Sequence, residues 1–201
     1  MMEHCRLSES SKKLFQKYYE EKKSIILVLG HQGNWEWGGN AFSIHCKQQL
    51  YVIYHPLENK HYNNLIIGMR TRFGTKLIEM KNTFRDMVST KNEINATAFI
   101  ADQTPPPENA FWTTFLNQDT PVFKGTELIA RKLNYPIVFI NVKKIKRGYY
   151  EVFAETICEN PSVTSDGEIS KLHTEKLEEE IRKIPETWLW THRRWKHKRP
   201  G

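Results

Sequence analysis

The chain has 201 residues, of which 39% are hydrophobic and 26% are charged. This balance excludes an intrinsically disordered chain and is ordinary for one globular domain with a sizeable core. The formal net charge of +7 favours an anionic partner, such as a phosphate-bearing ligand, an acidic carrier protein, a nucleic acid or a membrane surface.

Strands and helices are predicted to alternate along the whole chain. In the first part we expect, in order, a helix from about residue 8 to Glu21, a strand over Ile25–Leu29, a helix capped by Asn34, a strand over Leu50–Tyr54, and a helix from Asn59 to about Arg72. In the second part we expect a short strand over Lys76–Glu79, a short helix over Thr83–Val88, a strand over Ala96–Ala101, a long aromatic loop over residues 104–123, a helix over Gly125–Leu133, a strand over Ile137–Val142 hairpinned to one over Tyr149–Thr156, and a helix over Ile169–Lys183. This alternation predicts an α/β sandwich.

Cysteine spacing and hydropathy indicate the compartment. Cys5, Cys46 and Cys158 are scattered and lack a C-x-x-C pairing, so we expect reduced thiols rather than a disulfide frame or a zinc site. No apolar run approaches the roughly 20 residues that span a bilayer. The first residues also lack the apolar stretch of a signal peptide.

A histidine and a glutamate, His31 and Glu36, follow the first buried strand at H-x-x-x-x-E spacing. An imidazole titrates near neutrality and a carboxylate can orient it, so this pair could take a proton from a hydroxyl. On one helix the two side chains would lie about 140° apart, but with Gly33 making a turn both could reach one opening. The alternative is a structural histidine and a first-turn carboxylate that only stabilises its helix. Gly38-Gly39 favours the functional interpretation, because glycine costs roughly 1 kcal/mol inside a helix unless backbone or ligand approaches closely.

Three further polar groups could bind ligands. Arg70 and Arg72 at a helix end suit bidentate binding of phosphate or carboxylate, or are simply solvated. Asp102-Gln103 follows a strand, where open α/β sheets bind ligands, although Asp102 could equally cap a turn. The tail Trp188–Arg199 mixes aromatic rings with cations, which suits a membrane interface, single-stranded nucleic acid, or a tryptophan-anchored turn with a solvated basic end.

Other catalytic signatures are missing from the sequence. It contains no G-x-S-x-G, H-E-x-x-H, G-x-x-x-x-G-K-[ST] or G-x-G-x-x-G segment. His31, Glu36 and Asp102 do not have a diagnostic metal-ligand spacing, so we expect no metal.

Together, these groups in this order resemble the late acyltransferases of bacterial lipid A biosynthesis, the lauroyl/myristoyl transferase family within the lysophospholipid and glycerol-phosphate acyltransferase superfamily. The resemblance runs from roughly Lys22 to the C-terminus. The positions that carry it are the H-x-x-x-x-E pair His31 and Glu36, the arginine-bearing segment Arg70-Thr-Arg72, the strand end Asp102-Gln103, and the terminal Pro185-Glu-Thr-Trp-Leu-Trp-Thr-His-Arg-Arg-Trp-Lys196. It implies one domain over residues 1–201, with an N-terminal helix in residues 1–22 and a catalytic core in residues 23–201. The core would be a mixed, mostly parallel sheet flanked by helices.

The resemblance also implies an activity and a site. A fatty acyl group would pass from an acyl carrier protein or coenzyme A thioester to a hydroxyl of a lipid A precursor or related lipid, without cofactor, metal or enzyme nucleophile. His31 would be the general base, and Glu36 would orient its imidazole. Arg70 and Arg72 would bind the oxyanion or a phosphate. The residues expected to bind substrate or organise the site are Asn34, Asp102, Gln103, Arg193 and Arg194.

The expected partners are acyl carrier protein and an anionic lipid, and the expected location is the cytoplasmic face of the inner membrane. Family members usually carry an N-terminal region with a membrane helix before the part matched here, and we expect this chain to lack it. The alternative functions are a non-catalytic protein that binds nucleic acid or an anionic membrane, and a lipid hydrolase that releases free fatty acid.

Overall fold

The computed structural model describes residues 3–199. The strands are β1 (Cys5–Leu7), β2 (Ile25–Leu29), β3 (Gln49–Tyr54), β4 (Lys76–Glu79), β5 (Asn95–Ile100), β6 (Ala110–Phe115), β7 (Gln118–Phe123), β8 (Ile137–Lys146) and β9 (Tyr149–Cys158). The α-helices are α1 (Glu9–Glu20), α2 (Trp35–His45), α3 (Lys60–Thr71), α4 (Thr83–Ser89), α5 (Gly125–Leu133) and α6 (Glu168–Lys183). The short 3-10 turns are η1 (Met80–Asn82), η2 (Pro107–Asn109), η3 (Pro161–Val163) and η4 (Pro185–Thr187).

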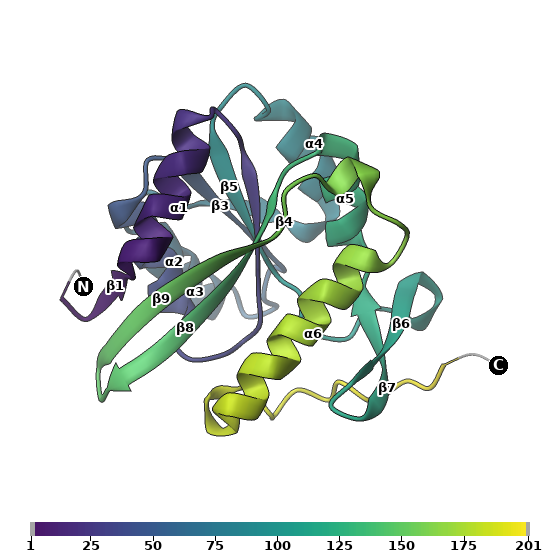
Figure 1. Cartoon of the computed structure of the whole chain (residues 1–201). Helices are drawn as coiled ribbons and strands as arrows, with labels where there is room; N and C mark the ends of the chain where they lie inside the picture. The colour runs from purple at the N-terminus through teal and green to yellow at the C-terminus, as the bar shows by residue number, and fades with distance from the viewer. Residues whose placement is uncertain (1–2, 200–201) are drawn as a thin grey trace.

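A seven-stranded sheet in the order β1-β9-β8-β2-β5-β3-β4 runs through the molecule (Figure 1). Its neighbouring strands are parallel except β8 and β9, which form the expected antiparallel hairpin. Every residue of β2 is buried, as expected for a parallel strand covered on both faces. The predicted α/β fold with a mostly parallel sheet is therefore confirmed.

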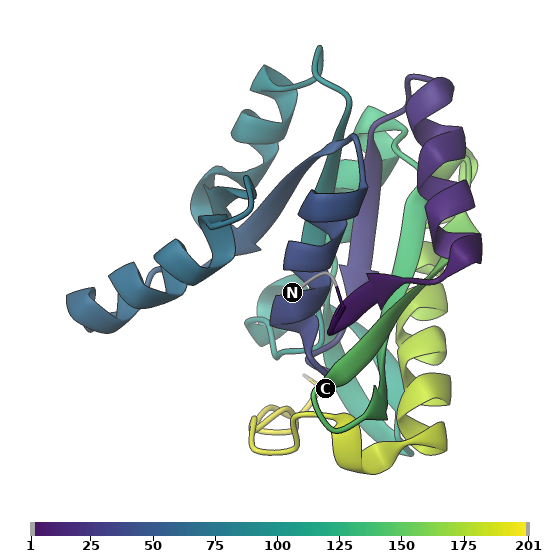
Figure 2. The same ribbon diagram turned by 90° about the vertical axis from the view of Figure 1, so that its left-hand side faces the viewer.

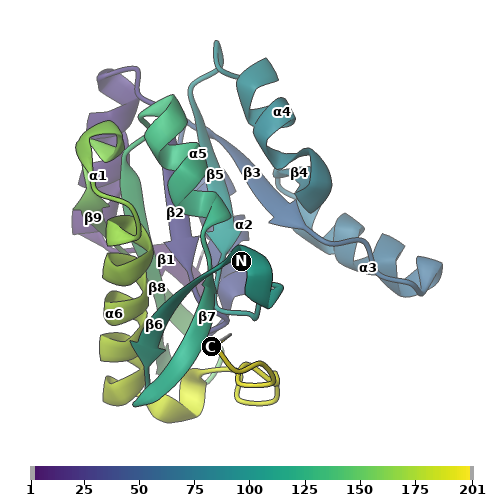
Figure 3. The same ribbon diagram turned by 90° about the vertical axis from the view of Figure 1, so that its right-hand side faces the viewer.

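Helices cover both faces of this sheet (Figures 1 and 3). Successive side chains of a strand point to opposite faces. On one face, Phe15 of α1 packs in the same cluster as Leu27 of β2. On the other face, Ala130 of α5 and Leu177 of α6 cluster with Val28. Residues 31 and 102 leave this sandwich at the carboxyl ends of β2 and β5.

Helix α3 projects away from the sandwich (Figures 2 and 3). Each of its residues retains some solvent exposure, and its side chains include Tyr62 and Leu65, which are 56% and 65% exposed. Within residues 3–199, neither α3 nor any other helix combines the length and the apolar character needed to cross a bilayer.

Two predicted segments differ from the structure. Residues 104–123, expected to be a loop, contain the antiparallel β6–β7 ribbon, in which Trp112 lies opposite Pro121. Residues 1–22 hold more than a helix, because β1 precedes α1 and pairs in parallel with β9. The outermost residues of the predicted domain, 1–2 and 200–201, lie outside the described part of the chain.

Candidate active site

His31 is held by a carboxylate from the neighbouring strand. Its Nδ1 lies 2.5 Å from Oδ1 of Asp102, and its backbone N–H donates to Oδ2 at 2.9 Å. The two residues are 71 positions apart, but Leu29 lies opposite Ile100 in the parallel β2–β5 pair, so both emerge side by side. The side chain of His31 is 15% exposed, whereas that of Asp102 is fully buried. The result is an oriented, accessible imidazole at the sheet edge where open α/β folds bind ligands.

The C-terminal segment supplies the other partners of Asp102. Trp188 Nε1 and Arg194 Nη2 each donate to Oδ2 at 2.9 Å, and Arg194 Nε donates to the Asp102 carbonyl at 2.7 Å. The guanidinium also lies 3.8 Å from the centre of the Trp188 ring. The Arg194 side chain is only 2% exposed, so the pair is a buried salt bridge with additional hydrogen bonds. Sequence reasoning included Asp102 and Arg194 but missed the role of Trp188, whose signal was the W-x-W-x-H-R-R pattern.

The same segment fixes the loop that carries His31. The backbone N–H of Leu189 donates to the His31 carbonyl, and that of Gly33 donates to the Thr187 carbonyl, both at 2.9 Å. Gly33 has a φ of +63°, and a Cβ there would lie 2.0 Å from the Val142 carbonyl oxygen. Glycine is therefore required at this turn, where the sequence predicted one.

Asp102 is ionised in this environment. Burial would raise its pKa, but the hydrogen bonds from the side chain and backbone of His31, together with the charge of Arg194, hold the pKa well below its usual range. An ionised carboxylate can only accept hydrogen bonds, so Nδ1 of His31 carries the proton in this pair. The neutral imidazole then has its lone pair on Nε2, which is the tautomer that a general base needs.

Glu36 has a different partner from the expected one. Its carboxylate accepts hydrogen bonds from Arg70, with Oε1 2.6 Å from Nη2 and Oε2 3.0 Å from Nε. The structure corrects the expected pairing: the group on Nδ1 of His31 is Asp102, and Glu36 holds Arg70. The physical reason is that α2 directs its first turn towards α3, while the strand register brings Asp102 to the imidazole.

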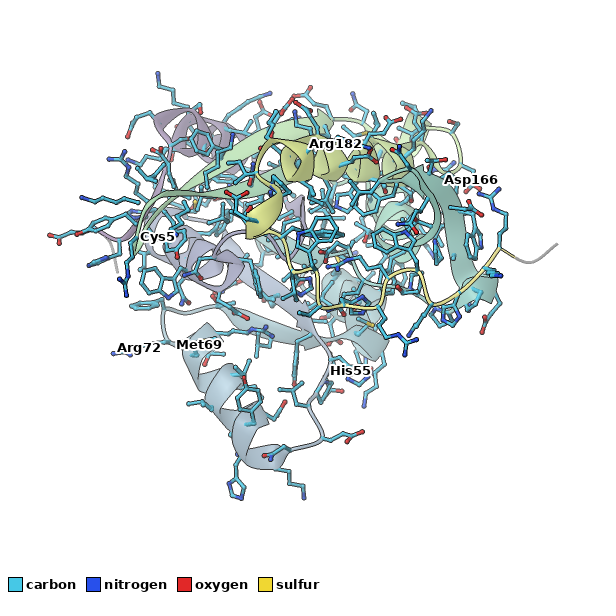
Figure 4. The ribbon with its side chains drawn as sticks, turned by 90° about the horizontal axis from the view of Figure 1, so that it is seen from below. Cys5, His55, Met69, Arg72, Asp166 and Arg182 are labelled. Carbon is cyan, nitrogen blue, oxygen red and sulfur yellow. The ribbon has the colours of Figure 1, made fainter. Side chains whose placement is uncertain are left out.

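The remaining predicted residues occupy several environments. Asn34 caps α2, because its side chain accepts a hydrogen bond from the Trp37 backbone at 3.1 Å. Gln103 is half-buried and lines a small cavity together with Asp102 and Arg194. Arg72 is exposed and points away from the body of the molecule (Figure 4), and Arg193 is exposed as well. Of the predicted set, His31, Asp102 and Arg194 form one cluster, and Glu36 with Arg70 forms another.

Two aromatic rings of the C-terminal tail pack against other residues of the protein. Trp188 is 3% exposed, and the ring of Trp195 stacks on Phe115 while its Nε1 donates to Thr120 at 2.8 Å. Trp190 is the more accessible ring at 51% exposure. Bases cannot stack on rings that are already packed, so the feature that suggested nucleic-acid binding is mainly structural.

An apolar cavity lies beneath α2. This α2 cavity has a volume of about 60 Å³ and is lined mainly by aliphatic side chains of the sheet, with Glu36 and Arg70 as its charged lining residues. The ring of Trp35 lines it and also meets the His31 ring edge-on, 5.0 Å between centroids. Gly38 lets the helix approach, because a Cβ there would lie 2.8 Å from a Val142 methyl group. The close approach expected at Gly38-Gly39 is therefore found at Gly38, whereas a Cβ at Gly39 would make only an ordinary contact with Leu50 at 3.9 Å.

The thiols do not offer a nucleophile. Burial raises the pKa of Cys5 to about 11 and that of Cys46 to about 12, and it also raises the pKa of Cys158. Each therefore remains a protonated thiol at neutral pH. Among the described side chains, no three of the His, Cys, Asp and Glu residues gather as a possible metal site.

Comparison with known proteins points to one family. The family model described as bacterial lipid A biosynthesis acyltransferase matches residues 6–197. The chain is similar to the lipid A biosynthesis palmitoleoyltransferase of Escherichia coli (strain K12), with 24% identity over 186 residues that cover 90% of this chain and 58% of the relative. The same figures hold for the lipid A biosynthesis acyltransferase of Shigella flexneri. The chain thus spans little more than half the length of these relatives.

Proposed function

Because the chain belongs to the bacterial lipid A biosynthesis acyltransferase family, we propose that it transfers a fatty acyl group from a thioester to a hydroxyl of a lipid A precursor. The observation that carries this proposal is the imidazole of His31, oriented by a buried carboxylate and adjacent to the apolar α2 cavity. The thioester is that of an acyl carrier protein or coenzyme A, and the net charge of +7 suits an acidic carrier and an anionic membrane surface.

The chemistry needs one base. Nε2 of His31 takes the proton of the acceptor hydroxyl as the oxygen attacks the thioester carbonyl. Asp102 stabilises the imidazolium that forms, as an orienting carboxylate does in a hydrolase triad. The tetrahedral intermediate then expels the thiolate, which receives the proton from His31, so an ester and a free thiol leave the site.

Arg70 is the proposed donor for the oxyanion of this intermediate. Its guanidinium lines the α2 cavity and is held by two hydrogen bonds from its Nε and Nη2 to Glu36. A preorganised cation at the developing charge lowers the barrier without reorganisation at the moment of reaction. Glu36 therefore serves the reaction by positioning Arg70, and the α2 cavity takes the first methylenes of the donor chain, next to the thioester.

The test is an acyl-transfer assay with purified protein, acyl carrier protein thioester and a lipid A precursor. We expect acylated product, and we expect His31→Ala to lower the rate about 10²–10⁴-fold. His61→Ala, an exposed histidine on α3, is the matched control and should keep the wild-type rate. Full activity in His31→Ala would contradict the proposed base. Release of free fatty acid without an acceptor would instead identify a hydrolase.

A further inference from the structure

Another apolar cavity lies on the opposite face of the sheet. It lies between α4 and α5 over the ends of β3 and β5, has a volume of about 170 Å³, and is lined by uncharged residues that include Ile53, Phe99, Gly125 and Ile129. We call it the α5 cavity. It is larger than an apolar cavity of about 150 Å³ that binds benzene in another protein. Such a volume beside a strand end can hold part of a hydrocarbon chain.

The α5 cavity reaches the same strand end as the proposed base. Ala101 lines it and directly precedes Asp102, whose carboxylate holds His31. Ile100 lines both the α5 cavity and the α2 cavity. The two cavities therefore lie on opposite faces of the sheet and approach each other at the carboxyl end of β5.

Exposed apolar side chains and a cation follow the lining of the α5 cavity on α4 and α5. Met80, which lines the cavity, is 48% exposed, and Phe84, the neighbour of the lining residue Thr83, is 37% exposed. The ammonium group of Lys132 lies 4.5 Å from the centre of the Phe84 ring. An accessible apolar edge beside a cation matches a hydrocarbon chain attached to a phosphorylated head group.

We propose that the α5 cavity binds part of a hydrocarbon chain of the phosphorylated lipid acceptor, while the α2 cavity takes the first methylenes of the donor chain. This inference rests on the proposed function, because transfer between two lipids brings two hydrocarbon chains to one base. It gives each chain its own face of the sheet. The acceptor hydroxyl then approaches His31 from the side opposite to the thioester.

Two lining positions of α5 allow larger side chains to be tested. Gly125 lines the cavity, and a Cβ added there meets nothing within 4 Å of its position. Gly125→Leu therefore adds a side chain at the rim of the cavity without a clash. Gly68→Leu is the matched control, because a Cβ at Gly68 on the exposed α3 likewise meets nothing within 4 Å. Ile129→Trp fills the same cavity from the next turn of α5 and serves if the first variant is unstable.

The direct test uses a phosphorylated lipid A precursor with a diazirine at the end of one acyl chain. After irradiation and digestion, mass spectrometry should find the label on residues of the α5 cavity, such as Ile53 or Ile129. Gly125→Leu should lower this labelling at least about tenfold, and Gly68→Leu should leave it unchanged. Labelling confined to α2-cavity residues such as Phe42, or labelling that survives both filling variants, would overturn the proposal.

A kinetic test separates this inference from the proposed function. Gly125→Leu should raise the KM for a long-chain acceptor at least about tenfold and leave that for a short-chain acceptor nearly unchanged. His31→Ala should still be labelled, because it removes the base and not the cavity. A wild-type protein that is labelled in the α5 cavity but transfers no acyl group would refute the function alone. Transfer with unaltered acceptor kinetics in both filling variants would refute the inference alone.

Discussion

Two arginine–carboxylate pairs flank the candidate active site, and they differ mainly in their access to water. Arg194 and Asp102 are 2% and 0% exposed, and Trp188 with the backbone of residues 102 and 189 completes their hydrogen bonds. Arg70 and Glu36 are each 23% exposed, and Arg70 comes from the projecting helix α3.

This difference decides what each pair can do. Removing one member of a buried pair leaves an uncompensated charge and costs about 3–5 kcal/mol, whereas an accessible pair contributes about 0–1 kcal/mol. The Asp102–Arg194 pair therefore fixes the orientation of the His31 imidazole, the proposed base. The Glu36–Arg70 pair contributes little to the stability of the fold, so a change in it can be tested for its effect on the reaction.

Breaking the buried pair at its carboxylate should have the largest effect. Asp102→Asn removes the charge that orients His31 and leaves Arg194 buried without its counterion. We expect the free energy of unfolding to fall by about 3–5 kcal/mol and the transfer rate to fall about 10²–10⁴-fold. Urea unfolding and the acyl-transfer assay measure the two effects. Glu36→Gln is the matched change in the accessible pair and should lower the free energy of unfolding by less than about 1 kcal/mol. Equal losses of unfolding free energy in the two variants would show that the two pairs do not differ in their contribution to stability.

Changing the buried arginine should come next. Arg194→Gln leaves Asp102 without its cation, and we expect a loss of about 3 kcal/mol in unfolding free energy. Arg194→Lys keeps the charge but loses the planar fork that bonds Oδ2 and the backbone carbonyl, so its loss should be intermediate. Arg193→Gln, at the exposed neighbouring position, should stay within about 0.5 kcal/mol of wild type. A destabilised Arg193→Gln with a stable Arg194→Gln would contradict the structure.

The buried histidine His173 of α6 should make the stability of the protein sensitive to mild acid. Burial lowers the pKa of His173 to about 4, so its folded form stays neutral while the unfolded chain binds a proton below about pH 6.5. Stability should therefore fall as the pH drops from about 6.5 to 4, by up to about 3 kcal/mol. Asp102 affects stability at a lower pH than His173. Its pKa is depressed in the folded protein, so its stabilising contribution is lost only as the pH falls below the usual carboxylate range.

Denaturant titrations at several pH values separate these groups. His173→Leu should flatten the stability profile between about pH 6.5 and 4, because the variant lacks the group that titrates there. His61→Leu, an exposed histidine on α3, should keep the wild-type slope. An unchanged slope in His173→Leu would show that another group governs acid sensitivity.

Breaking the accessible pair should have the smallest effect on stability. Arg70→Gln should lower the free energy of unfolding by less than about 1 kcal/mol, because water already reaches both partners. If Arg70 binds the oxyanion, the kcat of the same variant should fall about 10²–10³-fold. A variant that loses stability but keeps its kcat would reverse the roles assigned to the two pairs.

Much of this fold follows from local sequence patterns. The run of buried aliphatic residues Ile25–Leu29, the cap at Asn34 and the hairpin turn at Gly148 each specify their element through nearby residues. β1 could not be predicted, because three residues carry too little pattern and gain their conformation by pairing with β9. The β6–β7 ribbon was missed because the prolines at 105–107 cannot continue a ladder and favour a loop, whereas the ribbon begins only at Ala110.

In the candidate site, too, the identity of single residues follows from local sequence, whereas their contacts depend on distant parts of the chain. His31, Asp102 and Arg194 could each be recognised from residue type and position. Their partnership could not, because the bond between His31 and Asp102 depends on the register of two strands that are distant in the chain. The H-x-x-x-x-E spacing suggested Glu36 as the partner since it is close in sequence, and closeness in sequence does not determine which side chain reaches the imidazole.

The order of synthesis gives the buried pair a further consequence. Trp188 and Arg194 follow Asp102 by 86 and 92 residues, and ribosomes add about 5–20 residues per second. The carboxylate is therefore translated roughly 5–20 s before its cation exists. A nascent chain arrested in that interval would carry the imidazole and the carboxylate but lack the groups that lock them in place.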